Sequence, residues 1–161
     1  MSKKYNPYLG QSGHLLVMSE LLYRGWNVAI PQVDKGEDIF VVEDGKDGIK
    51  AIQVKTTIGK GDKDKFSAGF NLRSDQFNAP DNPPLHYVFV VRHLDKWQKF
   101  FIIKRSDFVD KFVDNGIAYS TSKKTFRLVF SYSKEGEVIK CRKIDFSYCL
   151  NNWVNFNEIT H

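Results

Sequence analysis

Three side chains that could act together on a phosphodiester fall within one short stretch of the chain. Asp38 stands at the start of an apolar run, and Gln53 and Lys55 interrupt a second apolar run further along. Carboxylate and amide oxygens are hard ligands of the kind that Mg²⁺ prefers. A nearby amine can orient a water molecule, take up its proton or stabilise charge in the transition state. These are the parts needed for metal-dependent phosphodiester hydrolysis.

The apolar runs around these residues predict an antiparallel hairpin. Residues 39–42 and 49–57 have the composition of strands, and the turn between them contains two glycines that can adopt positive φ. Side chains alternate between the two faces of a strand, so Gln53 and Lys55 share one face. Asp38 lies next to them if the two strands pair. A surface hairpin with Gln and Lys turned to solvent explains the residue types alone equally well.

The rest of the pattern predicts one α/β domain over residues 1–161, with a mixed sheet. A helix at residues 11–24, which Ser12 would cap and Gly25 would end, precedes the hairpin. The other predicted strands are residues 26–31, 66–72, 86–91, 99–104, 126–133 and 137–144, with a helix at 107–115 capped by Ser106 and a last short helix ending near Trp153.

The composition is that of a soluble globular protein, with 42% hydrophobic and 27% charged residues. No apolar run approaches the ~18 residues of a transmembrane helix, and no apolar stretch follows the first lysines as a secretory signal would require. Cys141 and Cys149 form neither a disulfide framework nor a zinc site. These features predict a cytoplasmic protein with reduced thiols and no membrane partner.

Positive charge is concentrated just downstream of the hairpin. The chain has a net charge of +5. Much of this excess comes from residues 50–73, which contain only two acidic residues and six basic ones: Lys50, Lys55, Lys60, Lys63, Lys65 and Arg73. A solvated lysine loop is one interpretation. A surface for a polyanion is the other.

The order of these features resembles the PD-(D/E)xK nuclease superfamily, which has the restriction-endonuclease-like fold. The matching features are the helix, RGWNVAIP at 24–31, GED at 36–38 and IQVK at 52–55. The Gln-x-Lys form of the motif resembles the branch that contains methyl-directed restriction enzymes and many small bacterial proteins. The resemblance implies a three-layer core with a mixed central sheet flanked by helices, here with an added C-terminal β-hairpin and short helix.

The resemblance also implies roles for individual residues. Asp38 and Gln53 would hold Mg²⁺ or Mn²⁺, and Lys55 would act in catalysis. Gln53 stands where an acid is usual, which removes one negative charge and should weaken metal binding. Many relatives carry a Glu in the helix, about eleven residues before the glycine that ends it, and this chain has His14 there.

Helical geometry chooses between His14 and the one glutamate of the predicted helix. At 100° per residue, Leu15, Met18, Leu21 and Leu22 form the predicted apolar face, and Gln11 and His14 lie beside it. Glu20 falls on the other side, where Arg24 is its i,i+4 partner. We therefore predict that His14 helps to position water, phosphate or metal. The alternative is a buried histidine whose ring bonds a backbone carbonyl.

Taken with the resemblance, these residues predict a metal-dependent endonuclease that acts on DNA. Lys60, Lys63 and Lys65 would lie at the mouth of the site and neutralise phosphates, with Arg73 just beyond. A homodimer would be one way to cut both strands. The alternative is a catalytically inactive module on the same fold that binds nucleic acid or a protein, an alternative that Gln53 and His14 keep open.

Overall fold

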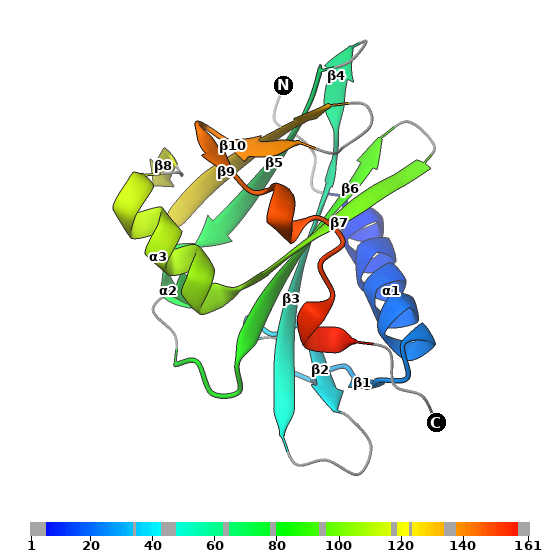
Figure 1. Ribbon diagram of the computed structural model, residues 1–161. Coiled ribbons are helices and arrows are strands. Elements are labelled where there is room, and N and C mark those ends of the chain that lie inside the picture. Colours follow the sequence, from blue (N-terminus) through cyan, green and yellow to red (C-terminus); the bar gives the residue numbers. More distant parts are fainter. Residues whose placement is uncertain are drawn as a thin grey trace.

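The computed structural model describes residues 6–33, 35–42, 48–62, 65–77, 80–93, 96–116, 119–122, 124–133 and 138–157. Within them, one long helix and two packed sheets form three layers, with α3 beside the second sheet (Figure 1). The elements are α1 (Pro7–Tyr23), β1 (Asn27–Ala29), β2 (Ile39–Val42), β3 (Ile49–Ile58), β4 (Lys60–Asp62), β5 (Lys65–Arg73), α2 (Ser74–Phe77), β6 (Leu85–His93), β7 (Lys96–Lys104), α3 (Arg105–Asn115), β8 (Tyr119–Ser122), β9 (Thr125–Ser133), β10 (Ile139–Cys141) and β11 (Ile144–Asp145).

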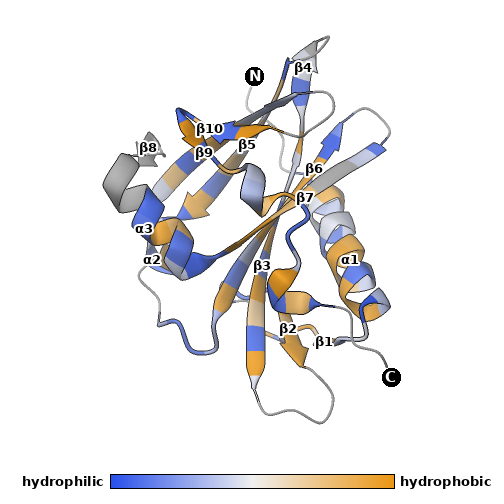
Figure 2. Cartoon of the chain, in the orientation of Figure 1, coloured by the Kyte–Doolittle hydropathy of each residue, from blue (hydrophilic) through white to orange (hydrophobic). Residues whose placement is uncertain are grey.

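The first sheet is mixed, as the sequence predicts. Its strand order is β1-β2-β3-β6-β7, in which β3 and β6 run parallel and the other neighbours are antiparallel. The predicted hairpin is therefore present as β2 and β3. Strand β6 is buried from Leu85 to Val91 because α1 covers one face of the sheet and the second sheet covers the other. Hydrophobic residues accordingly follow the crossing strands and α1 (Figure 2).

The second sheet has the order β11-β10-β9-β5-β4, with β8 also paired to β9. Strands β5 and β9 pair from Lys65 opposite Ser133 to Arg73 opposite Thr125. The inward side chains of this sheet, among them Phe70 and Phe130, pack on Phe89 and its neighbours in the first sheet. The α/β architecture agrees with the predicted fold class, and the layer opposite α1 consists mainly of strands.

Two predicted helix starts are wrong. Helix α1 begins at Pro7, where Asn6 is the N-cap and its side chain accepts a hydrogen bond from Leu9 N (3.2 Å). Ser12 lies inside the helix and donates to Leu9 O instead (2.9 Å). Helix α3 begins at Arg105, so Ser106 is not its cap. A proline at the first helical position is favourable because its missing N–H has no partner there anyway.

The face of α1 that meets the sheet also differs from the prediction. Gly13, Val17 and Leu21 are buried, whereas Leu15 and Leu22 are more than half exposed. The helix is apolar on most sides, so its periodicity does not single out one face. Gln11 is exposed and does not face the sheet.

A glycine sets the rotation of α1. A Cβ added at Gly13 would lie 1.9 Å from Thr56 Oγ1, a distance that no real contact permits. The helix backbone therefore lies directly on β3, and only a residue without a side chain fits between them.

No helix in the described part of the chain has the length and apolar character to span a membrane.

The last described residues pack on the core between α1 and the first sheet, to which Trp153 and Phe156 contribute their rings. The predicted last short helix ending near Trp153 is wrong: the segment has a 3₁₀ turn at Ser147–Cys149, and a second 3₁₀ turn, Val154–Phe156, begins after Trp153. Phe156 packs edge-on against Trp26, and the Trp26 indole donates to Asn157 O (2.9 Å).

Candidate active site

Asp38 is fixed beside β3 by two backbone contacts. Its N–H donates to Ile52 O (2.8 Å), and its carboxylate Oδ2 accepts from Val54 N (2.6 Å). The pairing of β2 with β3, with Ile39 opposite Ile52, brings about this arrangement. The two strands therefore pair as predicted, and the acid lies next to the segment that carries Gln53.

Gln53 and Lys55 project from the same face of β3. Ile52 and Val54 pack in the core beneath α1, so the alternate residues face the second sheet. Gln53 is only 2% exposed, and its Oε1 has no hydrogen-bond partner within the described residues. Burial of an unpaired amide oxygen costs about 1–3 kcal/mol. A cation or a substrate donor at this point would satisfy that oxygen.

Strand β6 supplies a further polar group that the sequence does not reveal. The parallel register places Tyr87 opposite Gln53. Its hydroxyl is also buried without a partner among the described residues, and burial raises the pKa of Tyr87 to about 12. The phenol is thus a neutral donor or acceptor at ordinary pH. Tyr87 lies in a run of apolar residues, which gives no sign of a polar role.

His14 reaches the site from the helix layer. Its Nε2 lies 3.5 Å from Asp38 Oδ2, and the His14 side chain is 27% exposed. Glu20 is engaged elsewhere, since Arg24 donates to it twice, at 2.8 and 2.9 Å. The helix residue near the acid is therefore His14.

The cation-binding capacity of this site depends on few oxygens. Within the described ranges, no three His, Cys, Asp or Glu side chains gather as a metal site. Asp38 is held by its hydrogen bonds against Ile52 and Val54, the two neighbours of Gln53 along β3. The buried Gln53 Oε1 fits a hard cation, and any bound ion would need oxygens from water or substrate as well.

A small polar cavity adjoins the loop before Asp38, and the sequence gives no hint of it. Its volume is about 110 Å³. Arg105, 4% exposed, donates to Asp81 Oδ1 (3.1 Å) and to Gln76 O (3.2 Å). The cavity is lined by Lys35, Gly36, Glu37, Asp75, Gln76, Leu85 and Arg105. An arginine that follows a strand is usually exposed, so its type alone does not predict this burial.

The predicted nucleic-acid contacts are only partly brought together. Lys60 and Lys65 are exposed on the neighbouring strands β4 and β5 and line one groove. The lysine-rich segment, for which a solvated loop is one interpretation, therefore forms in part the paired strands β4 and β5. Arg73 lies at the opposite end of β5, where its Nε donates to Asp75 Oδ1 (3.1 Å). Lys63 lies outside the described residues.

Comparisons with known proteins bear on the fold. No protein-family model and no curated protein matches the chain. Among solved structures, the chain is similar to a bacterial homing endonuclease, I-Ssp6803I, with a TM-score of 0.53 and 14% identity, over 91% of this chain and 87% of that one. It is also similar to Hjc, a Holliday junction resolvase from Archaeoglobus fulgidus, with a TM-score of 0.45 and 13% identity, over 73% of this chain and 81% of that one.

The fold is like that of the homing endonuclease, and the mixed α/β architecture confirms the predicted fold class. At 14% identity the likeness to the homing endonuclease is a likeness of fold.

Proposed function

We propose that this protein is a metal-dependent endonuclease that hydrolyses phosphodiester bonds in DNA. The observation that carries the proposal is the junction of β2 and β3. There Asp38 accepts from Val54 N at 2.6 Å, one residue beyond Gln53, whose buried Oε1 has no partner among the described residues. Lys55 follows on the same face of the strand. The likeness in fold to a homing endonuclease supports the choice of DNA as substrate.

Asp38 and Gln53 would hold the metal ion, Mg²⁺ or Mn²⁺. When bound, such an ion supplies an activated water and positive charge against the phosphate. The Val54 amide and His14 orient the carboxylate of Asp38 from two sides. His14 is therefore a positioning residue, which acts through Asp38.

Lys55 supplies the amine. It lies two residues beyond Gln53 on β3 and is partly exposed, so it faces the substrate side of the site. In this position it orients the attacking water and stabilises negative charge on the phosphate in the transition state. Loss of this amine should affect turnover more than substrate binding.

The test is digestion of supercoiled plasmid and of single-stranded DNA with Mg²⁺ or Mn²⁺. Asp38→Ala and Lys55→Ala should abolish cleavage, and Gln53→Ala should reduce it less. Chelation of the metal should stop the wild type. Equal cleavage by wild type and Asp38→Ala would refute this assignment of the site. Cleavage of both strands in one encounter would call for a second site, which a homodimer would supply and light scattering would detect.

A non-catalytic module on the same fold is the second candidate. The observation in its favour is the lack of a three-carboxylate cluster among the described residues. It predicts salt-sensitive DNA binding without cleavage, and a melting temperature that Mg²⁺ does not raise. The nuclease predicts a rise that Asp38→Ala abolishes.

A further inference from the structure

The second sheet carries a row of lysine and serine side chains across four strands. Lys60 on β4 lies opposite Ser67 on β5, Ser67 lies opposite Ser131 on β9, and Ser131 lies opposite Lys140 on β10. Directly opposite residues share a face of a sheet. Neighbouring strands are about 4.8 Å apart, so the backbones of the two lysines are roughly 14 Å apart.

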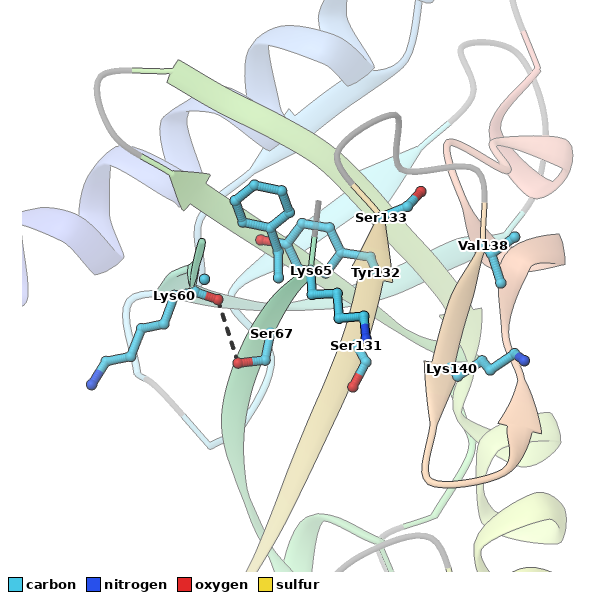
Figure 3. A pocket seen from close by; sticks show the side chains of 10 residues that line it. Lys60, Lys65, Ser67, Ser131, Tyr132, Ser133, Val138 and Lys140 are labelled. Carbon is cyan, nitrogen blue, oxygen red and sulfur yellow. Dashed lines mark hydrogen bonds between the residues drawn. The ribbon is translucent and has the colours of Figure 1, made fainter. Parts of the chain in front are cut away.

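A second row lies beside the first and contributes a third lysine. Lys65, two residues before Ser67, lies opposite Ser133 on β9 and opposite Asp62 on β4. The two rows line a groove of about 730 Å³ (Figure 3). None of the ten described residues that line it is acidic. We call it the Lys–Ser groove; Lys60, Lys65 and Lys140 supply its charge.

The aromatic rings at this groove are already packed. Phe66 stacks on Tyr132 with ring centroids 5.7 Å apart and meets the His93 ring at 4.5 Å. Tyr132 is buried. Proteins that bind single strands stack bases on accessible aromatic rings. Besides the half-exposed Val138, the Lys–Ser groove presents ammonium groups and hydroxyls, the groups that contact phosphates.

We propose that the Lys–Ser groove binds the sugar–phosphate backbone of duplex DNA. This rests on the proposed function and extends it by assigning the surface that holds the substrate. The backbones of the end lysines are roughly 14 Å apart, close to the ~12 Å width of the major groove, so the long side chains of Lys60 and Lys140 can approach phosphates on its two edges. Ser131, between them, can donate a hydrogen bond to the same backbone, whereas the Ser67 hydroxyl donates to Lys60 O (3.5 Å). Lys140 joins Lys60 only through the pairing of β9 with β10.

The experiment measures binding apart from cleavage. A labelled duplex of mixed sequence and its single strand are titrated with protein in EDTA, over a range of salt concentrations, with fluorescence anisotropy as the readout. Lys140→Ala should weaken duplex binding and reduce the slope of log K against log salt by about 0.9, the value for one lost phosphate contact. The matched control is Lys96→Ala, an exposed lysine at the start of β7 on the first sheet. It should leave both quantities unchanged.

Three results would overturn the proposal. They are unchanged duplex binding by Lys140→Ala, an equal loss in Lys96→Ala, and tighter binding of the single strand than of the duplex. Melting temperatures establish that the variants are folded. A wild type that cleaves plasmid but whose binding ignores Lys140 would refute the groove and leave the nuclease standing. Duplex binding that depends on Lys140, by a wild type that does not cleave plasmid, would support the groove and refute the nuclease.

Discussion

His14 Nε2 and Asp38 Oδ2 lie 3.5 Å apart, although the two residues come from different layers of the fold. The residue before His14 is Gly13, where α1 lies on β3 so closely that a Cβ would be 1.9 Å from Thr56 Oγ1. The helix can lie this close to the sheet only because Gly13 has no side chain. The contact between Gly13 and Thr56 therefore sets the distance from His14 to Asp38.

Gly13→Ala should destabilise the fold. In an open helix, alanine would gain about 1 kcal/mol over glycine, but overpacking costs about 1–3 kcal/mol and here should outweigh that gain. Thr56→Ala removes the nearest clashing atom, so the double variant should recover most of the loss. Thr56→Ala alone should be nearly neutral, because Oγ1 is buried without a partner in the described structure. Urea unfolding measures all four proteins, and strictly additive effects would contradict this account.

Gln53→Glu should couple folding to the metal. Gln53 is only 2% exposed, so a carboxylate at this position is costly to bury without a partner. The variant should therefore have a lower melting temperature in EDTA. Mg²⁺ should then raise the melting temperature by more than it does in the wild type. Gln53→Leu is the matched control, since it removes the unpaired oxygen and should lose any response to Mg²⁺. A Gln53→Glu variant that ignores Mg²⁺ would refute a metal site at this position.

His86 should make stability depend on pH. Burial, with repulsion from Lys50 and Lys104, lowers the pKa of His86 to about 4 from an ordinary value of 6.5. Between about pH 4 and pH 6.5, His86 is protonated in the unfolded chain but neutral in the native state. Stability is therefore full above pH 6.5 and is lost as the pH falls towards 4, by about 2 kcal/mol between about pH 7 and pH 5.

His86→Leu should remove that part of the pH dependence. Other groups still titrate in the variant, so the quantity to compare is the difference between the two proteins in urea unfolding at each pH. A loss of stability in the variant equal to that of the wild type would show that His86 is not responsible.

The two thiols should be inert in the native state. Burial raises the pKa of Cys149 to about 11 and also raises that of Cys141. The thiolate is the reactive form, so labelling by a thiol reagent should be slow until the protein unfolds. Labelling rates with and without denaturant measure this. Rapid native labelling of either thiol would mean that its end of the core opens readily.

The sequence predicts the local parts of the site better than the distant ones. Asp38 immediately precedes β2 and Gln53 lies in β3, the next strand along the chain, so alternation and pairing suffice to place their segments side by side. The pairing of Arg73 with Thr125 joins strands far apart in the chain, and periodicity carries no signal for it. The same holds for Lys140, which only the second sheet brings into one row with Lys60. The orientation of α1 depends on one glycine contact that apolar periodicity cannot reveal.

Strands β5 and β9 turn every other residue outward, while those between, such as Phe70 and Phe130, fill the core. Each outward residue is thus separated from the core by a layer of backbone. Changes on that surface, at Ser67 or Ser131 for instance, should cost little in folding. The protein could acquire a new preference among its targets one residue at a time, while the residues around Asp38 stay as they are.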